Sequence, residues 1–396
     1  MADSFSRRSF LTSSGRILSA GAIAGFAVRG AGRAVGSGSA EATGLTGTEP
    51  DPTRPRRTLR AGYLPITDAS SVLLAHELGE FARAGLPSAR PRLFRSWESL
   101  AQALVTGQID LAHLLLPTAL QLRMEHGLPV KVVSWAHTNG SALTVAPQIR
   151  AVRDLAGSRI AVPAWWSVHN LLAQAVLRAE GMVPKIRRGD GDVELVVMPP
   201  AEMLSALAAG HIAGFVVADP FTTMAAARGS GHILRFLGDI WHDHGCCAVV
   251  VHDRLIDEHP EMVQAAVDAI AAASHWLDTH RSTAADLLTA HASPYLPHRT
   301  EIVRAVHTRE QAAGNTLVHH PEWRGEHFGT GLFPFPSATS ALVELMRSSL
   351  VDAPTGFLSA IDPQSVHHRL VDDRFIRTAL SGRIDAVLHR TEEIRP

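Results

Sequence analysis

The chain has little cysteine, no surplus of positive charge and no long apolar run outside its N-terminal region. Its two cysteines, Cys246 and Cys247, are adjacent among 396 residues, and neighbouring cysteines rarely bond to each other because the geometry is strained. A disulfide-stabilised scaffold is therefore excluded. The formal net charge is −1, so there is no basic stripe to recruit nucleic acid or an anionic membrane surface.

The sequence also lacks the short motifs that mark common enzymes. It contains no G-x-S-x-G, no Walker loop, no G-x-G-x-x-G after a strand and no H-E-x-x-H. Ser141 lies in a turn of small residues, but nothing in the sequence places a base beside it. We therefore expect a protein that is not an enzyme, with no catalytic residues and no cofactor, although a triad assembled from distant residues is left open.

The N-terminal region has the features of an export signal. A twin-arginine pair in residues 6–11 precedes an apolar run, Ile17 to Val28, and small residues at 36–40. The run is shorter than the roughly 20 apolar residues that span a bilayer. We predict a twin-arginine signal over residues 1–40 and a location in the periplasm or at the cell surface, with a disordered basic tail as the alternative. No transmembrane segment is expected beyond it.

After the signal, alternating strands and helices predict an α/β protein. Apolar residues make up 46% of the chain, which is enough for sizeable cores, and residues 41–57 predict a flexible linker. We expect mixed, mostly parallel sheets flanked by helices, with strands near 59–64, 91–94, 107–113, 130–136, 142–146, 159–162, 194–198, 211–217 and 248–251. Helices are expected near 71–84, 98–106, 168–181, 201–209, 261–280, 283–292, 300–312 and 338–350.

Four junctions place a Ser, Thr or Asp between a strand end and a helix start. They lie at Thr67–Ser71, Ser96–Glu98, Trp165–His169 and Asp219–Thr222. In an open parallel sheet, ligands bind outside the carboxyl ends of the strands, where free N–H groups and helix dipoles favour an anion. If these junctions converge on one cleft, they would hold a small anion without a lysine. If they do not converge, each capping residue only stabilises its own helix. The pair Trp165-Trp166 either walls such a pocket, with His169 as a donor, or packs in the core.

The 22 histidines raise the question of a metal. The densest group of donors is Trp241-His242-Asp243-His244-Gly245-Cys246-Cys247. Zinc ligands are normally spaced to wrap the ion, whereas half of these crowded side chains would point apart on an extended segment. We therefore favour a loop that leads into the next strand, with Cys246 or Cys247 packed as a small apolar residue, and we assign no metal ligand.

Several segments, taken in order, resemble a known family. They are Gly62–Ala69, Ala75–Ala82, Ser96–Leu100, Gly107–His113, Asn139–Thr144, Val168–Leu172, Val217–Phe221 and Cys247–Val251. The ordered set covers about residues 59 to 275. It resembles the nitrate/sulfonate/bicarbonate family of periplasmic solute-binding proteins of ABC importers, and within it the nitrate- and bicarbonate-binding branch.

The resemblance implies a two-lobed periplasmic-binding-protein type II fold that closes over a solute. Crossings near 142–145 and 248–252 would separate one lobe, residues 58–145 and 250–396, from another, residues 146–249. The implied partners are a small-molecule solute and a membrane permease, with the chain a monomer. The resemblance implies four positions that contact the solute: Trp97, Ser141, His169 and Asp219. For Asp219 the family offers an alternative role as the ligand of a nearby metal. Thr67 and Asp68 match the first cleft turn, and Trp165 and His244 complete the expected ligand-binding set.

Departures from the nitrate branch bear on the solute. That branch has a lysine before its second crossing, where this chain has His244 to Cys247, and Asp219 and Ser141 replace its glutamate and glutamine. A histidine replaces a fixed cation only when protonated, and its ordinary pKa is about 6.5. We therefore favour an organic sulfonate, a carboxylate or a neutral heterocycle over nitrate itself.

Two other functions stay open from the sequence. The same fold serves enzymes of thiamin-pyrimidine and menaquinone precursor synthesis, whose substrates are cytoplasmic, so the export signal opposes that function. A metal-delivery receptor would use His242, His244 and the two cysteines.

Overall fold

Two β-sheets form the framework of the described residues, 57–186, 190–290, 292–308, 328–381 and 390–393 of a computed structural model. Residues 57–396 form one compact unit. The predicted export signal and nearly all of the predicted linker lie within residues 1–56, outside the described residues. In the described ranges, no helix is both long enough and apolar enough to cross a membrane.

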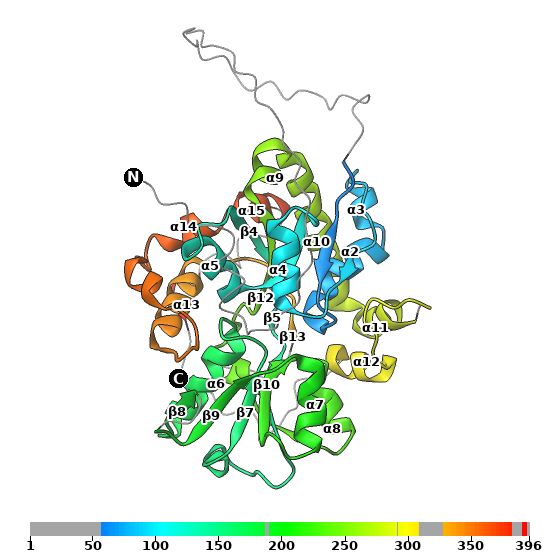
Figure 1. Cartoon of the computed structure of the whole chain (residues 1–396). Coiled ribbons are helices and arrows are strands. Elements are labelled where there is room, and N and C mark those ends of the chain that lie inside the picture. The colour runs from blue at the N-terminus through cyan, green and yellow to red at the C-terminus, as the bar shows by residue number, and fades with distance from the viewer. Residues whose placement is uncertain (1–56, 187–189, 291, 309–327, 382–389, 394–396) are drawn as a thin grey trace, which may run out of the picture. The chain divides into compact units, whose positions relative to one another are not determined.

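The first sheet has five strands in the order β2-β1-β3-β12-β4. Its strands β4 and β12 are labelled in the upper part of Figure 1. Strand β1 pairs in parallel with β2 and β3, whereas β12 is antiparallel to β3 and β4. The late strand β12 therefore fills the space between strands from the first part of the chain. The strands are β1 Ala61–Tyr63, β2 Arg92–Leu93, β3 Leu111–Leu115, β4 Val130–Trp135 and β12 Cys247–His252.

The second sheet has six strands in the order β11-β6-β10-β7-β9-β8. Strand β6 is antiparallel to β10 and β11, and the remaining pairs are parallel. Both sheets are thus mixed, as the sequence predicted in outline. The strands are β6 Ser141–Val145, β7 Arg159–Val162, β8 Pro184–Ile186, β9 Val193–Val197, β10 Gly214–Ala218 and β11 His232–Phe236.

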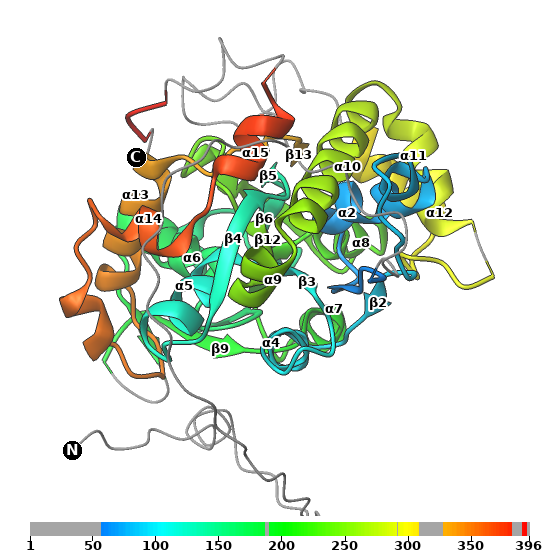
Figure 2. The ribbon, with the colours of Figure 1, turned by 90° about the horizontal axis from the view of Figure 1, so that it is seen from above.

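Helices cover both sheets. Helices α4 and α5 contact β3 and β12, whereas α6, α7 and α8 contact β10. The long helix α10 packs on α2 and α15 (Figure 2). In the first half of the chain the helices are α2 Ser70–Glu77, α3 Glu80–Arg83, α4 Trp97–Val105, α5 Leu116–Met124 and α6 Val168–Ala179. They continue with α7 Pro200–Ala208, α8 Phe221–Ala227, α9 Asp253–Glu258, α10 Pro260–Thr279, α11 Arg281–Thr289, α12 Thr300–Thr308, α13 Pro336–Ser348, α14 Val366–Leu370 and α15 Arg374–Ala379.

The chain passes between the two sheets twice, at residues 136–140 after β4 and at residues 237–246 before β12. Both passages come a few residues before the crossings expected from the sequence, because β6 already pairs in the second sheet and β12 lies wholly in the first. Strand β5 (Thr138–Asn139) pairs with β13 (Phe328–Gly329), and a bridge between Thr138 and Gly245 links the two passages.

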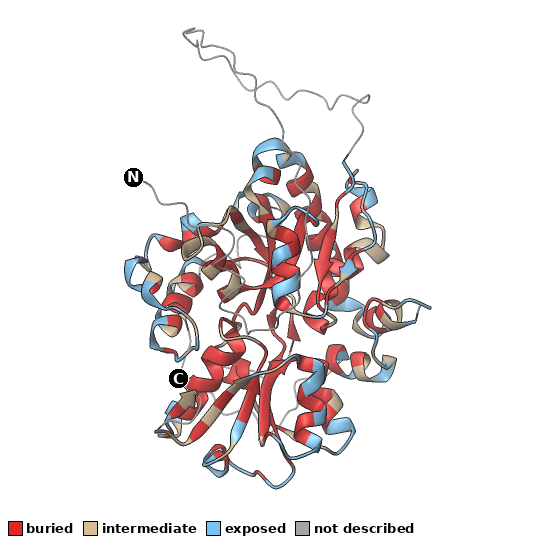
Figure 3. Cartoon of the chain, in the orientation of Figure 1, coloured by how far each residue is buried: buried red, intermediate tan, exposed pale blue. Residues whose placement is uncertain are grey.

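The buried residues concentrate in the strands of both sheets (Figure 3). Strands β3, β6 and β10 are buried along their whole length. Strands covered by helices on both faces are expected to be continuously apolar in this way. The sheets therefore form the cores, and the polar residues at strand ends are buried with them.

Two of the helices differ from what the sequence led us to expect. The helix expected over 71–84 is two helices, because Gly79 adopts a φ of 75° and ends α2. Helix α5 was not expected from the sequence. Most of its residues are buried, so its apolar residues lack the helical period that identifies a surface helix.

Candidate functional site

The first cleft turn expected from the sequence is tied to the junction around Asp219. The backbone N–H and the Oγ1 hydroxyl of Thr67 both donate to the carbonyl oxygen of Asp219, at 3.0 and 2.9 Å. The backbone N–H of Asp219 donates in turn to the carbonyl oxygen of Gly140, at 3.0 Å. Residues that adjoin the two different sheets are therefore held together by short hydrogen bonds.

The carboxylate of Asp219 is already engaged by its own helix. Its Oδ1 accepts from the hydroxyl of Thr222, and from the backbone N–H and hydroxyl of Thr223, both at 2.9 Å. These contacts satisfy donors at the start of α8. Asp219 thus has a structural role as a cap, whatever further contact its carboxylate makes.

His169 and Ser141 form a second hydrogen-bonded pair, which joins helix α6 to strand β6 of the second sheet. Ser167 is the N-cap of α6, where its Oγ accepts from the backbone N–H of Asn170 at 3.1 Å. This cap places His169 in the first turn, with Nε2 2.9 Å from Oγ of Ser141 on β6 and 3.7 Å from Sγ of Cys246. Within the described part of the chain, Nδ1 of His169 has no hydrogen-bond partner.

The tryptophans expected at the site differ in exposure. Trp97 is the first residue of α4 and is buried, and its indole N–H has no hydrogen-bond partner among the described residues. Trp165 is half-buried, and its carbonyl oxygen accepts from the side chain of Asn170 at 2.9 Å. Trp166 packs edge-on against Phe357. A buried indole N–H normally finds a partner, and among the described residues the indole N–H groups of both Trp97 and Trp166 have none. Of these two, Trp97 is the one at a position expected to contact the solute.

Asp68 and His137 form a fully buried ion pair. Nε2 of His137 lies 3.0 Å from Oδ2 of Asp68, and neither side chain has exposed surface. Burial raises the pKa of Asp68 to about 6, against the influence of His137. Burial by itself would lower the pKa of His137, but the adjacent Asp68 carboxylate raises it to about 10. His137 also stacks on Phe328, with ring centroids 5.5 Å apart.

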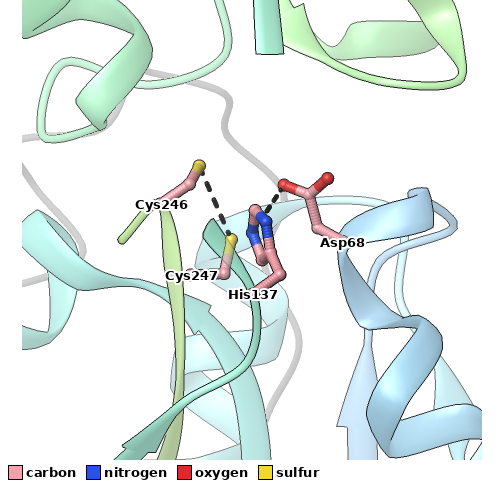
Figure 4. A group of neighbouring side chains, drawn as sticks. All are labelled: Asp68, His137, Cys246 and Cys247. Carbon is pink, nitrogen blue, oxygen red and sulfur yellow. Dashed lines mark hydrogen bonds and ion pairs between the residues drawn. The ribbon is translucent and has the colours of Figure 1, made fainter. Parts of the chain in front are cut away.

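Cys246 and Cys247 lie beside this ion pair, as Figure 4 shows. Both are buried free thiols with sulfur atoms 4.0 Å apart. The hydrogen bond from Cys247 and the neighbouring histidines lower the pKa of the Cys246 thiol well below its ordinary value, despite burial. Burial and the neighbouring Cys246 raise the pKa of Cys247.

Two further buried histidines, His113 and His244, lie near the same group. Burial lowers the pKa of His113 to about 3 and that of His244 to about 4, so both are neutral at pH 7. Nδ1 of His244 contacts the carbonyl oxygen of Trp241 at 2.9 Å. As far as the structure is described, its Nε2 and both ring nitrogens of His113 lack a hydrogen-bond partner.

The concentration of unsatisfied polar atoms is the main feature of this region. Buried polar groups in folded proteins are nearly always hydrogen-bonded, and leaving one unpaired is costly. Beyond the Asp68–His137 ion pair, the unpaired atoms in the described ranges include those of Asp68, His113, His137, His169 and His244. The Cys246 thiol contributes to the pKa shifts of Asp68, His113, His137 and His244. Such a group is suited to bind a ligand or an ion.

The structure brings together only part of the set expected from the sequence. Hydrogen bonds join Thr67 to Asp219 and Ser141 to His169, and Asp68 and His244 lie near Cys246. Sequence reasoning missed His137 and His113. The signal that was available is their position: His113 lies on a buried strand, and His137 lies two residues after the end of another.

The structure brings together a different set of metal donors from the one considered in the sequence. Among the residues that the structure describes, the donor atoms that converge belong to Asp68, His137, Cys246 and Cys247, and neither His242 nor His244 joins them. Nε2 of His242 lies instead 3.4 Å from the Asp243 carboxylate, with its side chain 29% exposed. Both cysteines are buried, as expected for at least one of them.

Solved structures identify the fold. The periplasmic nitrate-binding protein NrtA from Synechocystis PCC 6803 aligns with a TM-score of 0.70 at 19% identity, over 83% of this chain and 89% of that chain. The alkanesulfonate-binding protein SsuA from Xanthomonas axonopodis pv. citri gives a TM-score of 0.57 at 20% identity, over 74% of this chain and 92% of that chain. The chain therefore has the fold of the periplasmic binding proteins.

Sequence comparison narrows this class to a family. The model of the NMT1-like family matches residues 53–292, and the chain belongs to that family. The nitrate/nitrite binding protein NrtA of Nostoc sp. (strain PCC 7120) is 27% identical over 240 residues, which are 55% of this chain and 53% of that protein. The chain thus spans about half the length of this relative. Together these comparisons confirm the resemblance to the nitrate/sulfonate/bicarbonate family, and all three proteins are named as binding proteins.

Proposed function

We propose that the chain is the solute-binding component of an ABC importer and works outside the cytoplasm after export through a twin-arginine signal. Its partners are a small-molecule solute and a membrane permease, and the binding unit is a monomer. Family membership and the nitrate- and sulfonate-binding relatives support this function. Closure of one lobe onto the other over the solute is a population shift, so the solute must contact both lobes.

The lobes follow the two sheets. We set their boundaries at residues 136–140 and 237–246 rather than near residues 145 and 249, because β6 pairs only in the six-stranded sheet. One lobe then carries Asp68 and Trp97, and the other carries Ser141, His169 and Asp219. The expected ligand-binding set therefore draws on both lobes, as closure over a solute requires.

The observation that carries the proposal is a set of buried polar atoms that have no hydrogen-bond partner among the described residues and that lie on both lobes and on the passage between them. The indole N–H of Trp97, Nδ1 of His169 and Nε2 of His244 are the groups we assign to the solute. Thr67 and Asp219 would contribute mainly by fixing the backbone there, and the half-buried Trp165 would contribute an apolar wall.

The chemistry of these groups bears on the class of solute. No lysine or arginine occurs among the unpaired buried groups of the described residues, and His244 is neutral at pH 7. Because Nδ1 of His244 donates its proton to the carbonyl oxygen of Trp241, Nε2 is an acceptor and suits an N–H or O–H group of the solute. The indole N–H of Trp97 binds an oxyanion by a hydrogen bond without supplying a compensating charge. We therefore propose a small anion or sulfonate-like solute with an organic portion, in preference to bare nitrate.

A ligand panel tests this function. Nitrate, bicarbonate, taurine, alkanesulfonates and pyrimidines are added separately to the protein without residues 1–40, and thermal unfolding is recorded. A solute at a hundredfold excess over its Kd stabilises the native state by about 2.7 kcal/mol. We expect a shift with one anion or sulfonate class, followed by measurement of Kd by calorimetry.

Two variants and a control locate the solute. Trp97→Ala and His169→Ala should abolish the ligand-induced shift while the unliganded fold is retained. Trp276→Ala is the matched control, because Trp276 is half-buried on α10 and stacks on His280. Normal binding by Trp97→Ala or His169→Ala would remove that residue from the site, and turnover of a panel compound would favour an enzyme on the same fold.

A further inference from the structure

Four metal-ligating side chains outside the solute contacts of Trp97 and His169 converge on one point. One donor atom from each of Asp68, His137, Cys246 and Cys247 lies within 4.8 Å of every other, and all four residues are buried (Figure 4). We propose that these four residues form a binding site for a single Zn²⁺ ion. The proposal goes beyond solute binding and does not depend on it, because the metal alone is the ligand.

The spacing of the donors matches a tetrahedral ion. Zn–S bonds of about 2.3 Å place two thiolates about 3.8 Å apart at the tetrahedral angle, and the two sulfur atoms here are 4.0 Å apart. Zn–N and Zn–O bonds of about 2.0 to 2.2 Å place those atoms about 3.4 Å apart, and Nε2 of His137 is 3.0 Å from Oδ2 of Asp68. The other donor pairs lie within 4.8 Å, so shifts of up to about 1 Å would bring all four donors to the distances of a tetrahedral ion.

The donor set selects zinc by its chemistry. Thiolates favour soft metals such as Zn²⁺ and Cu⁺, and four donors in a tetrahedral arrangement of two sulfurs with nitrogen or oxygen favour zinc. The ion would also satisfy one buried atom each of Asp68 and His137 among those that have no hydrogen-bond partner in the described part of the chain. His169, 3.7 Å from the sulfur of Cys246, is in position to orient that thiolate from outside the ligand set.

The fold explains how adjacent cysteines share one site. Successive residues of a strand point to opposite faces, but Cys246 precedes β12, which begins at Cys247. Gly245 allows this turn into the strand, because a Cβ there would lie 2.4 Å from Cε2 of Trp135. On the other side, Gly140 packs closely on Asp68 and His137, where a Cβ would lie 3.2 Å from Oδ1 of Asp68. Both passages between the sheets therefore contain a glycine at a point where a larger residue would displace its neighbours.

Metal binding is tested on the whole mature chain, after reduction and removal of metals with a chelator. Zn²⁺ affinity is measured by competition with a chromophoric chelator, and Co²⁺ is added separately to report thiolate coordination by its charge-transfer absorption. We expect one Zn²⁺ per chain and a Co²⁺ spectrum with thiolate-to-metal intensity. Cys246→Ser and Cys247→Ser should each weaken Zn²⁺ binding by at least about 100-fold, since even outer partners of a zinc ligand account for 10- to 100-fold.

The control is His242→Gln, which changes a neighbouring, partly exposed histidine that lies outside the group. It should bind Zn²⁺ as the wild type does. Circular dichroism of each metal-free variant checks folding, and the wild-type Co²⁺ spectrum reports thiolate ligands even where a variant does not fold.

Three results would overturn the zinc site. They are no uptake of Zn²⁺ or Co²⁺ by the reduced wild type, equal Zn²⁺ affinity in the wild type and both cysteine variants, and a Cys246–Cys247 disulfide that persists under reducing conditions. The result is independent of solute binding. A chain that binds Zn²⁺ but no panel solute keeps the site and contradicts the proposed importer function, whereas the reverse outcome contradicts only the zinc site.

Discussion

Polar side chains next to the two sheets satisfy their hydrogen-bonding needs differently. At the six-stranded sheet, the Asp219 carboxylate caps α8, and Ser141 contacts His169. At the five-stranded sheet, His113 and the Asp68–His137 pair have buried atoms that no hydrogen bond satisfies within the described ranges. The first arrangement leaves only Nδ1 of His169 without a partner among the described residues, whereas the second leaves several buried atoms for a ligand or an ion.

The difference assigns separate tasks to the two regions. Satisfied caps fix the positions of backbone and side chains before any ligand arrives, which lowers the entropic cost of binding. Unsatisfied buried groups raise the free energy of the empty state, so whatever binds them gains more. We therefore expect substitutions at the five-stranded sheet to have larger effects than substitutions of equal chemistry at the six-stranded sheet.

The largest effect should come from breaking the buried ion pair. His137→Gln leaves the Asp68 carboxylate buried without its cation, which should cost about 3 to 5 kcal/mol of unfolding free energy. Ser141→Ala removes one hydrogen bond to His169 and should cost about 1 kcal/mol. Urea unfolding of both variants with chelator present measures the difference. Equal costs would remove the distinction between the two regions.

A double variant sharpens this result. Asp68→Asn combined with His137→Gln removes both charges, so its cost should be less than the sum of the two single costs. Additive costs would show that the two side chains do not interact in the folded protein.

The next effect concerns the passage that carries the cysteines. Gly245→Ala would place a Cβ 2.4 Å from the Trp135 ring and should cost about 3 kcal/mol through overpacking. Gly356→Ala is the control, because no heavy atom lies within 4 Å of the added Cβ, and it should change stability by less than about 0.5 kcal/mol. Thermal unfolding of both variants is the measurement. A mild effect at Gly245 would mean that the passage relaxes easily.

His307 is an intermediate case, because one ring nitrogen is hydrogen-bonded and the other has no partner among the residues that the structure describes. Its Nε2 is 3.0 Å from Oγ of Ser70, and burial lowers its pKa to about 4. The unfolded pKa is about 6.5, so this contribution to stability is fully present above pH 6.5 and is lost as the pH falls toward 4. Between pH 7 and pH 5 the loss amounts to about 2 kcal/mol.

The variant His307→Gln should therefore lose less stability than the wild type when the pH falls from 7 to 5. Urea unfolding at the two pH values gives the comparison, and His275→Gln, which changes an exposed histidine on α10, serves as the control. Identical pH dependence in wild type and His307→Gln would contradict a neutral buried His307.

Local features of the sequence determined the fold class. Alternating strands and helices predicted the α/β architecture because apolar period, glycine stops and Ser/Thr/Asp caps act within a few residues. Strand β7 was predicted with the bounds it has, and Ser96 and Ser167 cap helices where the sequence indicated. The ordered segments also identified the family, which the comparisons confirm.

The tertiary structure alone decided which polar residues meet. Asp68, His137 and Cys246 lie far apart in the sequence, and they converge because β12 inserts between β3 and β4 while both passages run past the same point. Only the folded chain commits Oδ1 of Asp219 to a helix cap and turns His242 away from the cysteines. Strand order and burial depend on contacts between distant segments. Local propensity and periodicity do not predict those contacts.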